Sequence, residues 1–154
     1  MVPRKGCVKS MEKTMNETTC DISDKLHPDV QYLEPVYKIY GAKTSFSGRI
    51  VTVKCYEDNS LVEEALKGNG KESVLVIDAG GSMNCAMLGD KRAADAINNE
   101  WEGIIVHGLI RDSVAINGME IGIRALGVCP LKSIKNGVGD SNLIVNFSGV
   151  TFTP

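Results

Sequence analysis

The chain has 154 residues, a formal net charge of −2 and 43% hydrophobic residues. These values fit one soluble globular domain, and the weak net charge argues against direct nucleic-acid binding, which typically uses a basic surface. No stretch approaches the roughly 20 apolar residues of a membrane-spanning helix, so we expect no membrane protein. The five cysteines are widely spaced without a C-x-x-C pair, which predicts reduced thiols and a cytoplasmic location.

The chain is expected to begin with a flexible N-terminal extension over residues 1–16, followed by a single domain over residues 17–154. The extension is basic but lacks the apolar segment of a secretory signal. Thr18 offers N-cap chemistry for a short first helix, which the sequence His27-Pro28-Asp29 ends. The alternating run 36–40 is either a strand or an extended lead-in.

A strand, a helix and a second strand are predicted next. Residues 48–55 alternate and are rich in β-branched side chains, which is typical of a strand. Asp58-Asn59-Ser60 should cap a helix that Gly68-Asn69-Gly70 ends. Residues 74–78 form an uninterrupted apolar run, as expected for a buried parallel strand, and lead into the loop Gly80-Gly81-Ser82.

The second half of the chain repeats this alternation. Gly89-Asp90 should start a helix over residues 91–99, and residues 103–108 form another buried strand. A short helix is expected over residues 113–117. Alternating helices and strands predict an α/β fold in which parallel and antiparallel strands are mixed.

Two later segments are less clear. Residues 121–127 are ambiguous between helix and strand. Residues 142–152 alternate as a strand does, with Gly149 at a bulge or turn.

Polar residues follow the predicted buried strands, and ligands of α/β sheets bind outside the carboxyl ends of strands. A helix that begins at Asp90 leaves the amides of Lys91 and Arg92 without intrahelical partners, so they could hold a carboxylate. Arg111 could grip the same carboxylate with its planar fork. Asp112 offers the hard oxygens that Mg²⁺ or Mn²⁺ prefer.

Each of these residues also has a simpler structural explanation. An aspartate such as Asp90 at a helix start is more often a cap than a catalyst, and Arg111-Asp112 alone is an ordinary exposed dipeptide. The loop glycines lack the spacing of a phosphate-binding motif. His107, inside an apolar run, is more often a satisfied core or interface residue than a base. None of them decides the function alone.

In combination, however, these segments resemble the core of the regulator of ribonuclease activity A (RraA) family and its aldolase relatives. The resemblance rests on residues 74–82, Gly89-Asp90, residues 99–108 and Ile110-Arg111-Asp112, and it continues in one register from Thr18 to the end of the sequence. It implies a swivelling β/β/α domain with mixed sheets flanked by helices. It also implies a homotrimer, sometimes doubled to a hexamer.

Members of that family have two kinds of function. Some are class II, divalent-metal lyases of 2-oxo acids that cleave 4-hydroxy-4-methyl-2-oxoglutarate or 4-carboxy-4-hydroxy-2-oxoadipate. These enzymes also decarboxylate oxaloacetate, since both reactions pass through a pyruvate enolate. Others bind and inhibit ribonuclease E without catalysis, so a ribonuclease or RNA helicase partner is the alternative expectation.

The enzymatic branch is marked by an aspartate, twenty intervening residues and then Arg-Asp, and Asp90 precedes Arg111-Asp112 by this spacing. The resemblance implies that Asp112 anchors the metal ion, that Arg111 binds a substrate carboxylate or the enolate oxygen, and that Asp90 orients water or relays a proton. Substrate contacts from the start of the helix are implied for Gly89, Lys91 and Arg92.

Two departures from the family pattern bear on the reaction. Ala115 occupies a position where the aldolases often have a further acidic residue. The sequence also ends at Pro154, before the Ala-Asp-x-Asp-Gly segment and C-terminal arm of the aldolases. Oxaloacetate decarboxylation, which needs fewer groups, is therefore expected more firmly than aldol cleavage.

Overall fold

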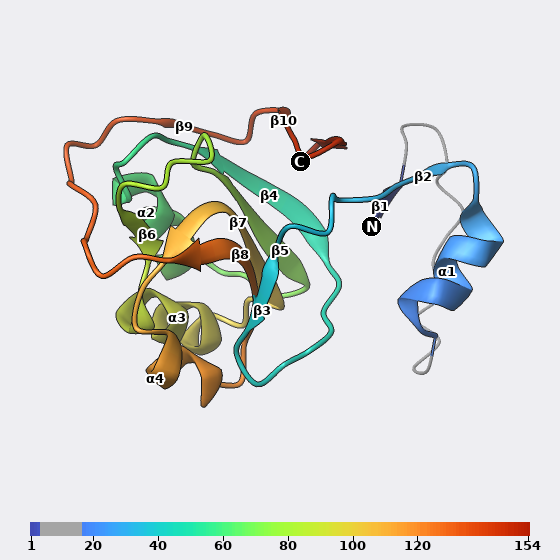
Figure 1. Cartoon of the computed structure of the whole chain (residues 1–154), viewed down its shortest axis with the longest axis horizontal. Coiled ribbons are helices and arrows are strands. Elements are labelled where there is room, and N and C mark those ends of the chain that lie inside the picture. Colours follow the sequence, from blue (N-terminus) through green and yellow to red (C-terminus); the bar gives the residue numbers. More distant parts are fainter. Residues whose placement is uncertain (4–16) are drawn as a thin grey trace.

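The computed structural model describes residues 1–3 and 17–154 (Figure 1). Most of the predicted N-terminal extension thus lies outside the described residues. Helix α1 (Thr19–Leu26) begins with the predicted cap, because Thr18 Oγ1 accepts a hydrogen bond from the Asp21 amide and the Asp21 carboxylate accepts one from the Thr18 amide. This helix buries no residue and stands apart from the sheet, beside the short pair β1 (Val2–Pro3) and β2 (Val30–Gln31).

Within the described residues, a seven-stranded sheet has the order β3-β8-β7-β5-β4-β9, with β6 added along β7. Its parallel strands are β4 (Arg49–Lys54), β5 (Ser73–Asp78), β6 (Ala86–Leu88), β7 (Gly103–Ile110) and β8 (Gly122–Val128). The antiparallel edge strands are β3 (Lys38–Tyr40) and β9 (Asp140–Ser141). The mixture of parallel and antiparallel strands is as predicted.

The two faces of the sheet are covered differently (Figure 1). One face carries the helices α2 (Ser60–Lys67), α3 (Asp90–Asn98) and α4 (Ser113–Asn117). The other carries the hairpin of β10 (Val145–Phe147) and β11 (Val150–Phe152). The domain therefore has a helical layer, a central sheet and a small β layer.

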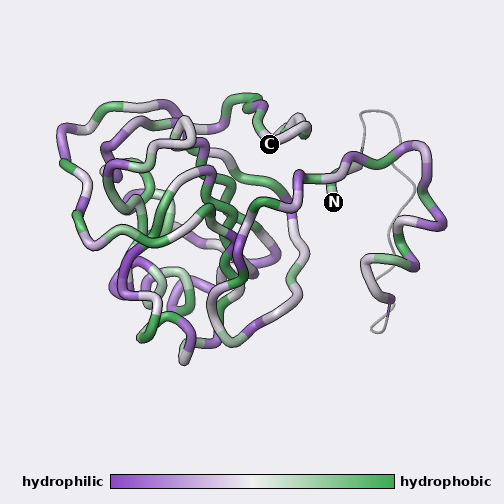
Figure 2. Tube along the Cα trace, in the orientation of Figure 1, coloured by the Kyte–Doolittle hydropathy of each residue, from purple (hydrophilic) through white to green (hydrophobic). Residues whose placement is uncertain are grey.

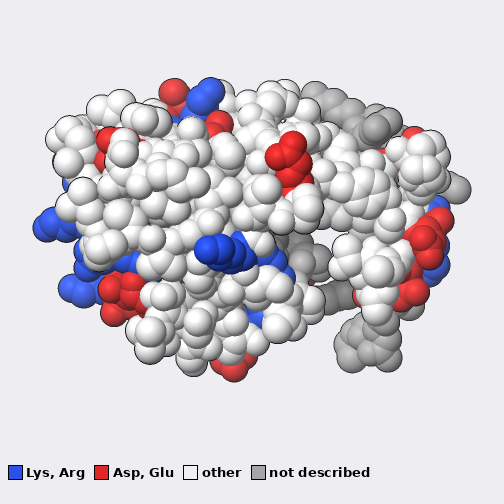
Figure 3. All heavy atoms as spheres, in the orientation of Figure 1, with Lys and Arg blue, Asp and Glu red and all other residues white. Residues whose placement is uncertain are grey.

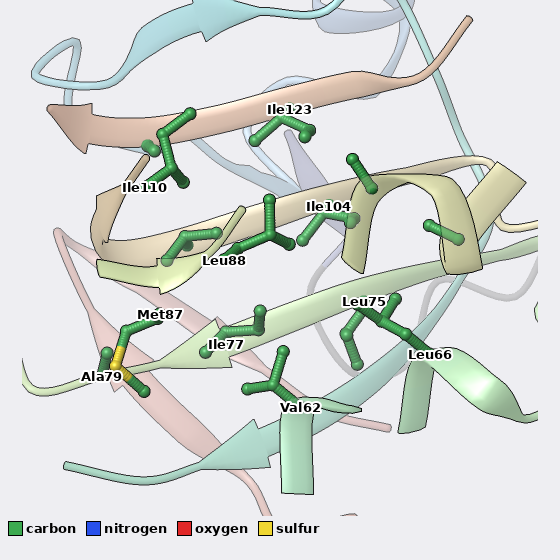
Figure 4. Packing of buried hydrophobic residues seen from close by; sticks show 14 of the residues in the cluster. Val62, Leu66, Leu75, Ile77, Ala79, Met87, Leu88, Ile104, Ile110 and Ile123 are labelled. Atoms are coloured by element: carbon green, nitrogen blue, oxygen red, sulfur yellow. The ribbon is translucent and has the colours of Figure 1, made fainter. Parts of the chain in front are cut away.

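Each layer contact has its own apolar cluster. Val62 and Leu66 point from α2 toward Leu75 and Ile77 of β5, and all four are fully buried (Figure 4). The hairpin contributes a second cluster against the opposite face of β5 and β7. Green stretches in the central strands of Figure 2 follow this burial. Because apolar burial is the main favourable term in folding, these clusters fix the sheet between its two covers.

The ambiguous segments resolve into strands. Residues 122–128 form β8, in which Ile123 and Ala125 are fully buried toward the helices. Arg124 points away from them and lies over the ring of Phe46 at 5.2 Å. The alternating 142–152 segment contains the β10–β11 hairpin, and Gly149, with φ of +77°, occupies its turn as predicted.

Two further expectations concern cysteines and membranes. The described cysteines, Cys20, Cys55, Cys85 and Cys129, form no disulfide, and the expectation of a reducing compartment stays a prediction. Among the helices in the described part of the chain, none combines the length and hydrophobicity needed to span a membrane.

Candidate functional site

The predicted site residues meet where β6 and β7 end side by side. Leu88 of β6 pairs with Ile110 of β7, and the Arg111 amide donates to the Leu88 carbonyl at 2.9 Å. Since the two strands are parallel, the residues that follow them leave the sheet at the same edge. This register brings Gly89 next to Arg111 and Asp112 although Asp112 lies 22 positions after Asp90 in the sequence.

Asp112 has an unusual role for a residue at the start of a helix. It is the N-cap of α4, in the left-handed conformation with φ of 56°, but its carboxylate forms no cap hydrogen bond to that helix. Instead, Asp112 Oδ2 accepts from Arg111 Nε at 3.1 Å and lies 3.4 Å from the Asp90 amide. The Asp112 carboxylate is thus turned toward the start of α3, where a bound metal ion or substrate would contact it.

The charge state of Asp112 follows from these contacts. The hydrogen bond from Arg111 has the largest effect and lowers the pKa of Asp112 below the ordinary value. Burial opposes it, and the amide of Asp90 adds a further, smaller lowering effect. Asp112 is therefore ionised at neutral pH. About a third of its side chain is exposed (33%), which leaves the carboxylate open to a bound ion.

Gly89 leaves the space that this arrangement needs. A Cβ atom at position 89 would lie 2.7 Å from Asp112 Oδ2 and 3.1 Å from Arg111 Cγ. Both distances are shorter than ordinary van der Waals contact, so any side chain would displace the two residues. The glycine before α3 is required by the site rather than by its own backbone angles, which are extended.

The first turn of α3 differs from the expectation of free amides. The Lys91 amide donates to Asp90 Oδ1 at 2.7 Å. Because the N-cap residue is Gly89, which has no side chain to accept from this turn, the Asp90 carboxylate folds back onto the amide. A bound carboxylate would have to replace Asp90 at the Lys91 amide.

The side chain of Arg92 points away from the Arg111–Asp112 pair. Its guanidinium pairs with Glu63 of α2 at 2.5 Å and lies 2.8 Å from Asp95 on its own helix. Glu63 also pairs with Lys67 and Lys135, and the three cations, Lys135 first, hold its pKa well below the ordinary range. Glu63 was missed in the sequence because only tertiary packing joins it to α3. Only the backbone of Arg92 remains available to a ligand at the start of α3.

The site can be tested for its fit to a divalent cation. Within the described residues, no group of three or more His, Cys, Asp or Glu side chains is arranged to hold a metal. Mg²⁺ and Mn²⁺ do not require such a cage, because they keep several waters and bind one or two protein carboxylates. An ionised, partly exposed Asp112 with Asp90 nearby, beside the space left at Gly89, fits that mode of binding.

Two other polar features predicted from the sequence, the glycine loop at Gly80 and His107, lie on the other face of the sheet. Gly80 and His107 line a separate cavity beneath Phe147 of the hairpin. His107 was predicted to be a core or interface residue, and it is only half-buried. Its Nδ1 lies 2.8 Å from Tyr37 Oη. Tyr37 was not recognised as a partner because it precedes β3, far away in the sequence.

Comparisons with known proteins agree over nearly the whole chain. The family model described as "RraA-like: Aldolase/RraA" matches residues 19–154. A protein of Aromatoleum aromaticum is 51% identical over 140 residues, which is 91% of this chain and 88% of that protein. A protein of Dechloromonas aromatica is 53% identical over 136 residues, which is 88% of this chain and 83% of that protein. Both are named "Putative 4-hydroxy-4-methyl-2-oxoglutarate aldolase".

Solved structures give the same fold. A protein of Geobacillus kaustophilus, described as an S-adenosylmethionine:2-dimethylmenaquinone methyltransferase, superposes with a TM-score of 0.87 at 43% identity, covering 90% of this chain and 86% of the other. The RNA-processing inhibitor RraA of a Thermus species superposes with a TM-score of 0.86 at 37% identity, covering 91% and 85%.

Proposed function

The chain belongs to the RraA-like family, and we propose that it is a divalent-metal-dependent lyase of 2-oxo acids that decarboxylates oxaloacetate. The observation that carries this proposal is the orientation of Asp112. Its carboxylate forms no cap hydrogen bond with its own helix, α4, and instead contacts Arg111 and the Asp90 amide beside Gly89. The aldolase name of relatives at 51% and 53% identity supports carbon–carbon cleavage.

In this proposal Asp112 holds Mg²⁺ or Mn²⁺, which when bound supplies a Lewis acid for the oxygens of a 2-oxo acid. Arg111 binds the substrate carboxylate or the enolate oxygen, because its guanidinium keeps donors beyond the Nε that contacts Asp112. The first-turn amides of α3, at Lys91 and Arg92, donate hydrogen bonds to the second carboxylate once Asp90 releases the Lys91 amide.

The steps of decarboxylation define the role of Asp90 in this proposal. The bond between C3 and C4 of oxaloacetate breaks, CO₂ leaves, and the electron pair moves toward the C2 oxygen to form a pyruvate enolate. Arg111 stabilises the charge that develops on that oxygen. A proton must then reach C3, and Asp90, freed from the Lys91 amide, relays it or orients the water that does so.

Aldol cleavage of 4-hydroxy-4-methyl-2-oxoglutarate is the further activity of this proposal, since it ends in the same enolate. It additionally requires a base for the 4-hydroxyl proton. Ala115 on α4 cannot be that base, so this activity should be the weaker of the two.

A direct test uses the full chain with Mg²⁺ or Mn²⁺ and oxaloacetate, with pyruvate followed by lactate dehydrogenase and NADH. The rate should exceed the free-metal background, fall to it with a chelator, and fall to it in Asp112→Ala. Asp24→Ala, an exposed change on α1, is the matched control and should retain the rate. An Asp112→Ala protein with unchanged activity would refute the assignment.

We propose that the chain assembles as a homotrimer, or as a hexamer of two such rings. Large apolar side chains are exposed on α4 and along residues 131–138, among them Val114 (90%), Leu131, Ile134 and Val138. Exposed apolar patches commonly mark protein contacts. Light scattering should give three or six times the chain mass of 16.6 kDa, and a monomer at all concentrations would exclude both assemblies.

The alternative function is binding and inhibition of a ribonuclease, or of an RNA helicase, without catalysis. It is favoured by the 37% identity and TM-score of 0.86 to a Thermus protein described as an RNA-processing inhibitor. On the face shown in Figure 3, Lys and Arg do not form a continuous stripe, so a protein partner fits better than RNA itself. Pull-down of ribonuclease E at low salt tests this, and absence of binding would argue against it.

A further inference from the structure

The cavity beneath Phe147 lies at the same edge of the sheet as Asp112 but on the face covered by the hairpin. Its volume is about 470 Å³, within the range of small-molecule sites. It is lined by residues at the ends of β4 and β5, by one residue within β7, and by residues of β9 and β10, namely Lys54, Cys55, Tyr56, Asp78, Gly80, His107, Asp140, Asn146 and Phe147. None of these residues belongs to the site at Gly89 and Asp112.

The floor of this cavity is a row of polar residues on adjacent strands. In register across β9, β4, β5 and β7 stand Asp140, Lys54, Asp78 and His107. Residues directly opposite one another point to the same face of a sheet, and neighbouring strands lie about 4.8 Å apart. The row therefore presents negative, positive and negative charges in turn, followed by an imidazole.

Asp78 is the buried member of the row, with 8% of its surface exposed. Its Oδ1 accepts a hydrogen bond from the Gly80 amide at 3.0 Å. Among the described residues it forms no ion pair, although buried carboxylates normally have a charged partner. Its second oxygen remains able to bind a ligand cation.

Contacts with Tyr37 and Phe147 orient the ring of His107, which is in register with Asp78. Its Nδ1 lies 2.8 Å from Tyr37 Oη, which lies 2.9 Å from Ser148 Oγ, and its ring stacks on Phe147 with 4.6 Å between centroids. With the proton on Nδ1, Nε2 is an acceptor. A Cβ on Gly81 would lie 3.1 Å from Nε2, so the glycine keeps that nitrogen accessible.

Charge and shape limit the ligand. Burial lowers the pKa of His107, so the imidazole is neutral at neutral pH, and two carboxylates face the single ammonium of Lys54. A dianionic 2-oxo acid is disfavoured by that balance. Lys54 is exposed and forms no ion pair within the described residues. Tyr56, 63% exposed, and Phe147 add apolar walls.

We propose that this cavity binds a free α-amino acid. Its ammonium group lies between Asp78 and His107 Nε2, its carboxylate contacts Lys54, and its side chain lies between Tyr56 and Phe147. The alternating charges of the row match a zwitterion whose ammonium and carboxylate groups are attached to the same carbon atom. This site is independent of the lyase activity proposed above.

The test begins with a thermal-shift screen of the full chain against the standard L-amino acids, followed by calorimetry with L-phenylalanine, 3-phenylpropionate and phenethylamine. The two analogues lack the ammonium and the carboxylate respectively. L-Phenylalanine should bind at least tenfold more tightly than either, since each analogue loses one charged contact. If no amino acid binds, or if 3-phenylpropionate binds as tightly as L-phenylalanine, the proposal is wrong.

Two variants locate the binding. Asp78→Asn, which keeps the shape of the side chain, and the exposed change Lys54→Gln should each weaken L-phenylalanine at least tenfold. Lys54→Gln keeps the test valid if Asp78→Asn does not fold. Asp112→Asn is the control and should bind L-phenylalanine as the unmodified chain does. Unchanged affinity in both Asp78→Asn and Lys54→Gln would place the ligand elsewhere and overturn the proposal.

Discussion

The two faces of one sheet edge differ in charge and in construction. On the helical face, the Arg111 guanidinium and the Asp90 amide at the start of α3 contact the Asp112 carboxylate, an arrangement suited to an anion bound with a metal ion. On the hairpin face, Asp78 and Asp140 flank Lys54 beside a neutral imidazole, an arrangement suited to an ammonium group. Parallel strands direct consecutive residues to opposite faces, so one edge can support two sites of opposite preference.

The largest effect is expected from a change in the planar guanidinium of Arg111, which belongs only to the site on the helical face. Arg111→Lys keeps the positive charge but cannot hold both Asp112 and a substrate oxygen with planar geometry. Oxaloacetate decarboxylation should fall on the order of 100-fold or more in kcat/KM, as when one transition-state donor is removed. Steady-state kinetics measure this. Lys54→Gln is the control from the hairpin face and should keep the activity, whereas an equal loss in both would mean that the sites are not separate.

Gly89→Ala tests whether the site depends on its open space. The added Cβ would lie 2.7 Å from Asp112 Oδ2, and displacement by about 1 Å can cost roughly 100-fold in rate. The melting temperature should change little, because position 89 has extended backbone angles that any residue adopts. Gly137→Ala provides a control at a glycine with no neighbouring atom, although its positive φ adds strain. Full activity in Gly89→Ala would show that the close packing is unnecessary.

Arg92 tests how the anion-binding turn is held. Arg92→Met and Glu63→Gln remove the ion pair that joins α3 to α2, so the first turn of α3 should lose its fixed position. We expect KM for oxaloacetate to rise by roughly tenfold with a smaller change in kcat. Lys67→Met is the matched control, since it removes an exposed partner of Glu63 that lies on α2 itself. A role in stability alone would lower the melting temperature without this rise in KM.

A change at Asp58, which joins the start of α2 to residues 136–138, should have a smaller effect. Burial by itself would raise the pKa of Asp58, but hydrogen bonds from Ser60, Val138 and Asn136 outweigh it and leave the pKa far below the ordinary 3.8. A depressed pKa stabilises the fold above the unfolded value, and this contribution is lost as the pH falls through the folded value.

Asp58→Asn should therefore lower the free energy of unfolding by about 2 kcal/mol at neutral pH. The difference from the unmodified chain should shrink below pH of about 4. Urea denaturation at several pH values measures it. A difference that stays constant down to the most acidic pH would mean that the charge of Asp58 contributes nothing.

The structure agrees best with the predictions that rest on local sequence patterns, such as an apolar strand followed by polar residues. The meeting of Asp90 with Arg111-Asp112 was expected from the family spacing, and Arg111-Asp112 follows a recognisable apolar strand whose carboxyl end lies at the edge where ligands bind. The short strand β6, which leads to Asp90 and pairs with β7, was not predicted. The strand over residues 122–128 was ambiguous because Ile121, Ile123 and Ala125 with Leu126 satisfy both a strand and a helical spacing.

Other features could not be predicted because they depend on strand register or on packing between helices. The cavity at His107 combines residues of five strands and the loops beside them, and only the register across β9, β4, β5 and β7 aligns its polar row. The pairing of Arg92 with Glu63 likewise requires α2 and α3 to be adjacent. Even the folding of the Asp90 carboxylate onto Lys91 depends on a helix that starts at a residue without a side chain.

The most direct test of the central claim is binding of Mn²⁺ to the full chain, measured by calorimetry and electron paramagnetic resonance without substrate. The account predicts that Asp112→Asn weakens Mn²⁺ binding by at least tenfold, while Asp78→Asn, from the opposite face, binds as the unmodified chain does. Equal Mn²⁺ affinity in Asp112→Asn and the unmodified chain, or a loss confined to Asp78→Asn, would contradict it.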